Sequence, residues 1–375
     1  MARTRTTSKT QPLRKMGGWL SSVARYRERF PRLLRSDFWW GPRSEAAVSS
    51  SRAGGSFSNH SASRLTGYYG SALLLEPLEM RRMLSTTPVY LNDNWAIVTD
   101  NGAAGLDNGD IVSNTGAGDD GTVLLKTFGT NAFNTLNSAL AGVSTGGTIN
   151  VLDGSYTGGV AVTQDVTLAG FGLGTKTINS GLSSAGIAIS GGADVTINGL
   201  TLNGAFTGVS VDASTLHMNS TIVQGASVFG VAVTNGSNAF INTSEITGTV
   251  TSAASVDVTA GNVDITNSLI TGSQRGLLVQ GSGTASVHGS NLTGNTVHAV
   301  ENAATTPTVI DASGNWWGSI LEASVLAQTG GDVDITPYLA TSNDLGGAAV
   351  GYLGDYSSLH VTTLGLQVGG TDRIS

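Results

Sequence analysis

The stretch INGLTLNG, residues 197–204, recurs along the chain and decides the fold. Related octets begin at Met218, Ile241, Ile265 and Val287, so that successive starts are 21, 23, 24 and 22 residues apart. Each octet has an apolar first residue, an aliphatic residue at the sixth place and glycine at the eighth. A period this short is typical of a solenoid, in which every repeat forms one coil stacked on the previous coil.

The spacing of aliphatic residues inside one repeat predicts three short strands. Val195 and Ile197 are two apart, as in a strand with one buried face, and Val209 and Val211 repeat that spacing after a second strand around Leu202. No helical period of 3.6 residues intervenes, so we expect an all-β, three-sided parallel β-helix. The equivalent second strands centre on Val223, Ile246, Ile270 and Leu292, and the third strands carry Val231/Val233, Val256/Val258 and Leu277/Val279.

Two further columns of the repeat are interpreted as structural. The glycine at the eighth place permits a bend that a Cβ atom would obstruct. The residue after the first strand position is often Asn, and stacked Asn side chains can stabilise turns, although the same column could instead form a binding face. The glycines are Gly204, Gly225, Gly248, Gly272 and Gly294, and the second column reads Asn198, Asn219, Asn242, Thr266, His288 and Asp311.

Residues 131–143 are expected to form a short helix that caps the amino-terminal end of the solenoid. Phe133, Leu136, Leu140 and Val143 fall on one face of such a helix. An open solenoid end exposes core side chains and strand edges, which a short amphipathic helix can cover.

Charge divides the chain into two kinds of polypeptide near residue 85. Residues 1–84 contain 15 Lys and Arg against five acids, whereas the remainder contains four against 21. We therefore expect a disordered basic leader at 1–85, an acidic lead-in rich in Gly, Asn and Asp at 86–130, the β-helix at 131–340 and a connector at 341–375. TDRIS at the end of the sequence looks like the start of another capping helix, so we also expect the chain to be the front of a longer protein.

Composition excludes several classes of partner. The acidic repeat region argues against a nucleic-acid partner, which would need clustered Lys and Arg. The chain contains no cysteine, so it forms no disulfides and no thiolate metal sites. No apolar run approaches the ~20 residues that span a bilayer.

Two resemblances suggest where the protein acts. LLLEPLEMRRMLS, residues 73–85, resembles the LEPR-x-LL-type motif of bacterial surface and secreted proteins, which implies export, although a chance amphipathic turn would look similar. GGTINVLDGSY, VTLAGFG and VTINGLTLNG resemble the right-handed parallel β-helix, or pectin-lyase-like, superfamily over about residues 130–340. The motif positions that match are Leu75, Glu76, Pro77, Leu78, Glu79, Arg81, Arg82 and Leu84, and Met80 and Met83 depart from the common form.

The pectin-lyase-like resemblance implies a search for an active site. Enzymes of this superfamily that cleave acidic polysaccharides use clustered carboxylates to bind Ca²⁺ and an Arg or Lys base. The best lyase-like set is Arg275, Asp264, Asp257 and Glu245, which lie at different phases of the coil. His217, His288 and His298 are interpreted as turn or surface residues. No cofactor is predicted apart from Ca²⁺, for which DNGDIVSNTGAGDD, residues 107–120, is a candidate loop without the twelve-residue EF-hand spacing.

ASGNWWGS, residues 312–319, places Trp316 and Trp317 where the next coil should continue. Counted from Ile310, the sixth place is Asn315 and the eighth is Trp317, so the pattern is predicted to fail there. We expect the two rings to cap the last coil, with stacking on a sugar as the alternative.

The favoured function is that of an exported, noncatalytic β-helix module at the cell surface or outside the cell, structural or adhesive, with extracellular polysaccharide or surface components as partners. The alternative is a carbohydrate-active enzyme of the pectate-lyase-like class that acts on an acidic polysaccharide.

Overall fold

A computed structural model describes residues 87–102, 104–115, 121–181, 183–248, 251–306, 308–361, 366–368 and 371–373. The basic leader and the motif at residues 73–85 lie outside these described residues. No helix in the described part of the chain is long and apolar enough to cross a membrane.

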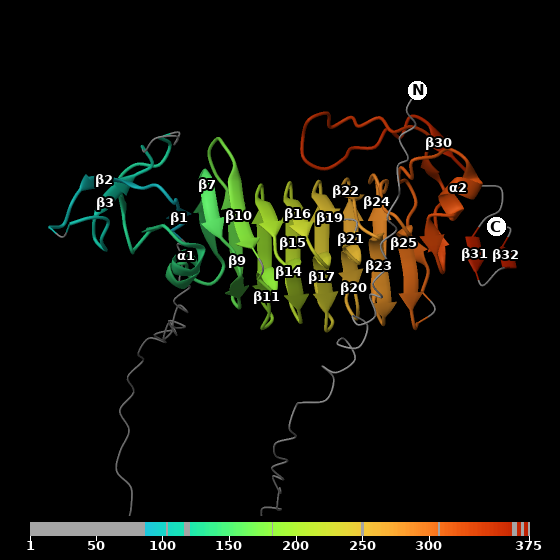
Figure 1. The fold of residues 1–375 in the computed structure, drawn as a ribbon, viewed down its shortest axis with the longest axis horizontal. Helices are drawn as coiled ribbons and strands as arrows, with labels where there is room; N and C mark the ends of the chain where they lie inside the picture. Colours follow the sequence, from blue (N-terminus) through green and yellow to red (C-terminus); the bar gives the residue numbers. More distant parts are fainter. Residues whose placement is uncertain are drawn as a thin grey trace, which may run out of the picture. The chain divides into compact units, whose positions relative to one another are not determined.

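From β6 to β28 the described chain is a right-handed parallel β-helix with three sheets (Figure 1). The repeat predicted the three-sided parallel β-helix, and the resemblance to the superfamily implied its handedness. Sheet 1 has eleven strands, sheet 2 has six and sheet 3 has eight. Each coil adds one strand to each sheet in turn, and neighbouring strands are parallel. Almost all regular structure is β, which confirms the predicted fold class.

The strands are short and evenly placed along the three sheets. Sheet 1 contains β6 (Gly147–Val151), β9 (Val166–Gly170), β12 (Asp194–Asn198), β15 (Thr215–Asn219), β18 (Asn238–Asn242), β21 (Asn262–Thr266), β24 (Thr284–His288), β26 (Ile310–Asp311) and β28 (Val333–Asp334). Sheet 2 contains β7 (Gly154–Thr157), β10 (Lys176–Gly181), β13 (Thr201–Gly204), β16 (Ile222–Ala226), β19 (Glu245–Gly248) and β22 (Leu269–Thr271). Sheet 3 contains β8 (Val160–Val162), β11 (Ala185–Ile189), β14 (Thr207–Asp212), β17 (Phe229–Thr234), β20 (Ala254–Val258), β23 (Arg275–Gly281), β25 (His298–Ala304) and β27 (Thr329–Gly330).

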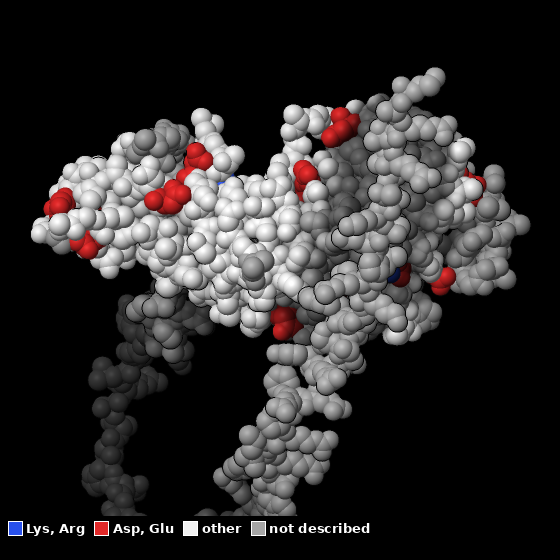
Figure 2. All heavy atoms as spheres, viewed as in Figure 1, with Lys and Arg blue, Asp and Glu red and all other residues white. Residues whose placement is uncertain are grey.

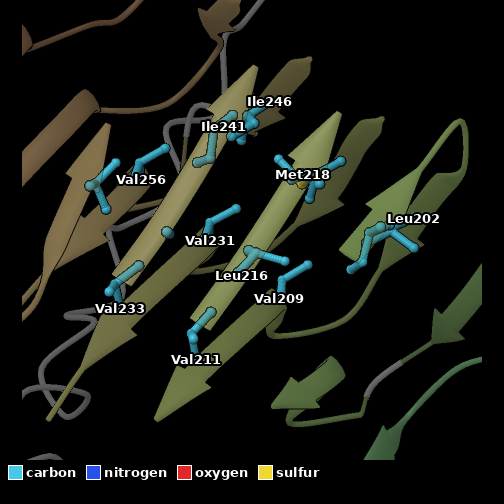
Figure 3. Close-up of a cluster of buried hydrophobic side chains, with 14 of the residues drawn as sticks. Leu202, Val209, Val211, Leu216, Met218, Val231, Val233, Ile241, Ile246 and Val256 are labelled. Carbon is cyan, nitrogen blue, oxygen red and sulfur yellow. The ribbon is translucent and has the colours of Figure 1, made fainter. Parts of the chain in front are cut away.

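The core is a set of aliphatic columns that run from coil to coil (Figure 3). In sheet 1, Ile197 pairs with Met218 and Met218 with Ile241, and all three are buried. In sheet 2, Leu202 pairs with Val223 and extends the same packing. Alternate residues therefore point inward, and the residues between them form the outer faces of the sheets.

The turn between sheets 1 and 2 uses a residue with left-handed backbone in each coil. This residue has φ +67° at Gly199, +46° at Ser220, +47° at Thr243, +50° at Asn267 and +60° at Gly289. Such φ values favour glycine and asparagine and reverse the chain within two residues. Of the predicted bend glycines, Gly204, Gly225, Gly272 and Gly294 have φ between +70° and +82°, whereas Gly248 has no positive φ and packs closely against the Ser273 side chain.

A ladder of buried hydroxyl groups joins these turns. The backbone N–H of Ser244 donates to Ser268 Oγ at 3.1 Å, and the N–H of Ser268 donates to Ser290 Oγ at 3.0 Å. Ser268 Oγ in turn donates to the Thr266 carbonyl at 2.8 Å. Thr221 and Asn315 continue this ladder at its two ends.

The asparagine column is placed in register but is not itself such a ladder. Asn198, Asn219 and Asn242 end three successive strands of sheet 1 and lie beside one another. Two cross-coil hydrogen bonds come from this column: Thr266 Oγ1 donates to Asn242 Oδ1 at 3.0 Å, and His288 Nδ1 lies 3.0 Å from the Ser313 carbonyl oxygen. A hydrogen bond between two asparagine side chains occurs instead in sheet 2, where Asn203 Nδ2 donates to Asn179 Oδ1 at 3.0 Å.

The amino-terminal end is closed by a helix and by a small lobe. Helix α1 (Leu136–Gly142) begins at Thr135, whose Oγ1 accepts from the Ser138 N–H at 3.2 Å, and buries Leu136 and Ala139 against the end of the core. The capping helix is confirmed but starts later than expected, because Ala132–Phe133 forms β5. Strand β1 (Val89–Leu91) pairs with β6 and β5, so sheet 1 already includes residues from the stretch assigned to the lead-in. A small antiparallel sheet of β2 (Ala96–Thr99), β3 (Ile111–Ser113) and β4 (Lys126–Thr127) has its own core around Trp95 and Val112.

At the carboxyl-terminal end the coil pattern continues through the tryptophans, contrary to the count from Ile310. Ser286 pairs with Asp311, so the counterpart of Val287 is Ala312 and not Ile310. Asn291 pairs with Trp316, which places Trp317 in the column that contains Leu292. The same shift means that Asp311 does not belong to the column that runs from Asn198 to His288. Ser313 is the next member of that column after His288.

Beyond Trp317, helix α2 (Glu322–Leu326) and strands β27 and β28 add a further partial coil. β29 (Tyr338–Leu339) then pairs antiparallel with β30 (Leu359–His360). Between them, residues 341–358 return over the turns of the solenoid, where the Tyr352 N–H donates to the Asn267 carbonyl at 2.9 Å. The short strands β31 (Leu366–Val368) and β32 (Thr371–Arg373) form a hairpin.

Candidate functional site

The four residues predicted as a lyase-like set are distributed over three sheets. Asp264 lies in sheet 1, Glu245 in sheet 2, and Asp257 and Arg275 in sheet 3. Asp264 accepts a hydrogen bond from Ser286 at 2.9 Å and Glu245 accepts one from Thr247 at 2.9 Å. The structure does not bring the four together, because each sheet directs its outer residues to a different side of the coil.

Arg275 and Asp257 have other partners in sheet 3. Arg275 Nε is hydrogen-bonded to Glu301, which also contacts His298 Nδ1 at 2.9 Å. Asp257 accepts hydrogen bonds from Gln280 at 2.6 Å and Thr259 at 3.1 Å, but burial raises the pKa of its carboxyl group. Burial acts to raise the pKa of Glu301 as well, but hydrogen bonds and charge from His298 and Arg275 outweigh it, so that this pKa is lowered.

Three cationic side chains, those of Lys126, Lys176 and Arg275, are engaged within the protein. Lys176 Nζ donates to the carbonyls of Gly172, Leu173 and Gly174 at 2.6, 3.1 and 2.9 Å, and it is almost fully buried. Lys126 Nζ lies 4.7 Å from the centre of the Tyr90 ring. With Arg275 bound to Glu301, the described side chains offer little to neutralise an acidic polysaccharide. Figure 2 shows the same imbalance on one face, with scattered acidic side chains and scarcely any basic ones.

The candidate Ca²⁺ loop is only partly described, since residues 116–120 lie outside the described residues. Within the described part, Asp110 is buried and its carboxylate accepts from the backbone N–H groups of Asn101 and Asp107, each at 2.9 Å. This carboxylate therefore stabilises the loop. The described residues contain no group of three or more His, Asp or Glu side chains placed to hold a metal ion.

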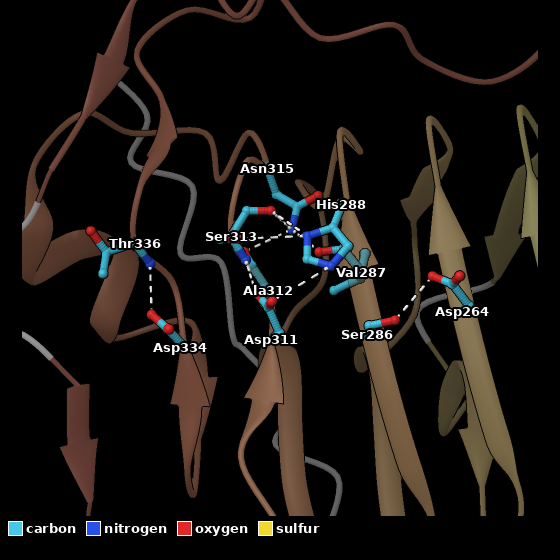
Figure 4. A network of polar contacts seen from close by, with 10 residues as sticks. All are labelled: Asp264, Ser286, Val287, His288, Asp311, Ala312, Ser313, Asn315, Asp334 and Thr336. Atoms are coloured by element: carbon cyan, nitrogen blue, oxygen red, sulfur yellow. Dashed lines mark hydrogen bonds and ion pairs between the residues drawn. The ribbon is translucent and has the colours of Figure 1, made fainter.

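The two tryptophans face opposite ways. Trp317 is fully buried in the core, whereas Trp316 is half-buried on the outer face of sheet 2. The preceding Asn315 anchors this coil, because its amide donates to the carbonyls of Val287 and Ala312 at 2.6 and 2.8 Å (Figure 4). Its Oδ1 also accepts from the Ser290 N–H at 2.8 Å. Only Trp316 remains accessible for stacking on a sugar.

A shallow hollow of about 550 Å³ lies on the outer face of sheet 1. Its floor is formed by outward-facing residues of β9, β12 and β15, and its rim is formed by the turns that precede them. Its polar side chains belong to five residues in three successive coils, with Asn219 at the edge: Asp165, Thr167, Asp194, Thr196 and His217.

A flat aromatic pair borders this hollow. His217 and Phe240 are partners on adjacent strands, so the strand spacing sets their ring separation. Their centroids are 4.9 Å apart with 10° between the ring planes, and the Phe240 residue is 39% exposed. Asp194 Oδ1 lies 3.5 Å from His217 Nε2 and holds the imidazole on the side toward the hollow. The hollow, defined by Asp165, Thr167, Asp194, Thr196, His217 and the adjoining Phe240, is here called the sheet 1 groove.

The interpretation of His217 as a surface residue agrees with its position but misses its neighbours. A search for acid pairs at enzyme-like spacing overlooked Asp165, Asp194 and Phe240, which are 29 to 75 residues apart. A signal was nevertheless present, because these residues all occupy outward positions of the first strand in successive coils.

Comparison with known proteins gave no match to a family model, to a curated protein or to a solved structure.

Proposed function

We propose that this chain is an exported, noncatalytic β-helix module that binds a glycan in the sheet 1 groove. The single observation that carries the proposal is the parallel stack of His217 and Phe240 beside a polar hollow. The exposed part of the Phe240 ring can contact the C–H groups of a pyranose, while neighbouring carboxylate and hydroxyl groups can bond its hydroxyls.

The geometry of the groove suits an extended ligand better than catalysis. Outward residues repeat at the spacing of the coils, about 4.8 Å, so that contacts recur along the sheet. Catalysis of glycoside cleavage requires an acid and a base or nucleophile on opposite sides of one bond. Asp165 and Asp194 instead occupy neighbouring positions on one face, where the Asp194 N–H donates to Asp165 Oδ1 at 2.8 Å.

Export is part of the proposal and is supported by the sequence of the leader. A basic segment followed by the motif at residues 73–85 precedes an acidic, cysteine-free solenoid. A fusion of residues 1–86 to a reporter enzyme, fractionated between cytoplasm, envelope and medium of a bacterial host that exports proteins with this motif, tests it. Retention of the reporter in the cytoplasm would contradict export.

Glycan binding is tested by affinity electrophoresis and calorimetry with neutral and charged polysaccharides. Phe240→Ala should weaken binding at least several-fold, because it removes one ring of the stack. Phe206→Ala is the matched control, since Phe206 is also an exposed phenylalanine (58%) but lies between sheets 2 and 3. Equal loss in both variants, or release of new sugar ends or unsaturated products by the protein, would contradict the proposal.

A further inference from the structure

We infer that the sheet 1 groove selects a glycan that bears free amino groups, a polycationic chain of hexosamine units, over acidic and N-acetylated glycans. The inference rests on the proposed glycan-binding function and specifies its ligand class. It starts from the charge of the whole outer face of sheet 1, which the aromatic stack alone does not determine.

The outer face of sheet 1 carries carboxylates along its length. Asp194, Asp264, Asp311 and Asp334 all lie at outward positions of its strands, and Asp165 precedes β9. The described strands of this sheet contain no lysine or arginine. Among the described residues of this face, His217 and His288 each lie within 4 Å of one of these aspartates. At the amino-terminal end of the same sheet, Lys126 Nζ lies over the ring of Tyr90 in β1.

The two carboxylates in the groove have no cationic partner of fixed charge. Asp165 and Asp194 occupy the same position in successive coils and are both exposed. Asp194 contacts only the titratable imidazole of His217 among described charged groups, at 3.5 Å. Two like charges one strand spacing apart raise the local negative potential, which an ammonium group on a ligand would relieve.

The face also discriminates against other glycans. A uronate would bring a carboxylate next to Asp165 and Asp194 with no described Lys or Arg to receive it, and like charges repel at this distance. An N-acetylated sugar could still stack on the His217–Phe240 pair but would lose the ion pairs. The stack favours a sugar ring over a basic peptide, because pyranose rings present flat C–H faces at regular spacing.

The inference is tested with the full chain and three matched probes: hexamers of glucosamine, of N-acetylglucosamine and of galacturonic acid. Calorimetry in low-salt, mildly acidic buffer, in which the amines are protonated, should show the glucosamine hexamer binding at least about fivefold more tightly than the N-acetylated one, as expected for one or more exposed ion pairs. The preference should shrink as salt is added.

Variants separate charge from stacking. Asp194→Asn should reduce the preference for glucosamine severalfold and leave the affinity for N-acetylglucosamine unchanged. Asp212→Asn, an aspartate at the end of β14 on sheet 3, is the matched control and should change neither. Circular dichroism confirms that both variants are folded.

The outcomes distinguish this inference from the proposed function. Equal affinity for the glucosamine and N-acetylglucosamine hexamers, or tighter binding of galacturonic acid, would overturn the inference but leave a glycan-binding groove. A preference for glucosamine that survives Asp194→Asn and Asp165→Asn together would also overturn it. If no hexamer binds, the inference is overturned, and the proposed function is overturned as well if none of the neutral and charged polysaccharides binds.

Discussion

Replacing Trp317 with alanine tests the register assigned to the last coils. Trp317 is fully buried and occupies the column that contains Leu292, so alanine would leave a large cavity. A buried tryptophan removes roughly 200 Å² from water, which at about 25 cal/mol per Å² amounts to about 5 kcal/mol. Measured costs for deleting buried aromatic side chains, about 3–5 kcal/mol, agree with this value, and we expect a loss in that range.

Three further substitutions sharpen this test. Trp317→Leu restores the residue type of the column and should cost clearly less than alanine. Trp317→Phe keeps most of the ring and removes an indole N–H that has no hydrogen-bond partner among the described residues, so its cost should be less than half that of alanine. Trp316→Ala, on the outer face of sheet 2, should cost less than about 1 kcal/mol.

The assay is urea denaturation followed by circular dichroism, together with hydrogen exchange of residues 285–340. Because each coil of a solenoid contacts only its neighbours, Trp317→Ala should accelerate exchange in the last coils before those around residues 195–245. If Trp316→Ala destabilises the protein as much as Trp317→Ala, or if exchange rises equally in all coils, the assigned register is wrong.

Three other substitutions test interactions within the solenoid. Ser268→Ala should cost about 1–3 kcal/mol of unfolding free energy in urea, because it leaves the buried Ser244 N–H without its acceptor, whereas the exposed Ser282→Ala should cost almost nothing. The pKa of Glu301 is lowered in the fold, so the stabilisation from its carboxylate is complete above the ordinary glutamate pKa of about 4.3 and is lost as the pH falls through the lower, folded value. Glu301→Gln should therefore make the urea midpoint less dependent on pH over that acidic range. A variant whose midpoint depends on pH as strongly as that of the unmodified protein would contradict this. Lys176→Met should lower the melting temperature by leaving three carbonyls without their donor, and a rise in melting temperature would show that the buried charge costs more than its bonds return.

The sequence determined the fold because the β-helix is a local, repeated structure. The aliphatic residues at Ile197, Leu202 and Val209 specify which side of each strand is buried, and the next coil repeats them about 22 residues later. Stacking equivalent strands in parallel register is then the arrangement that buries all of these columns together. The capping helix could be predicted for the same reason, since Leu136 and Val143 need a core to pack against.

The buried hydroxyl ladder could have been predicted as well. Ser244, Ser268 and Ser290 occupy the fourth place of their octets, next to the Asn column that drew attention first. Asn is the more familiar ladder residue, but in sheet 1 the Asn side chains point outward while the serines point into the turn.

The error at the tryptophans arose from the phase of the count. Ile310 and Ala312 are two residues apart, and both are buried, so either could have been the first residue of an octet. Alanine is a weak signal for a core position, and only the pairing of Ser286 with Asp311 shows that Ala312 is the equivalent residue.

The hollow and the orientation of its aromatic rings, in contrast, were decided by the tertiary structure. His217 and Phe240 are 23 residues apart in sequence, and nothing in either neighbourhood indicates that their rings are parallel and 4.9 Å apart. Sequence periodicity determines which residues point outward, because burial follows the alternation of a strand. The repeat also indicates which outward residues become neighbours, since His217 and Phe240 each directly precede an octet. How their side chains are oriented, and that a hollow lies beside them, is decided only when the stacked coils pack their side chains against one another.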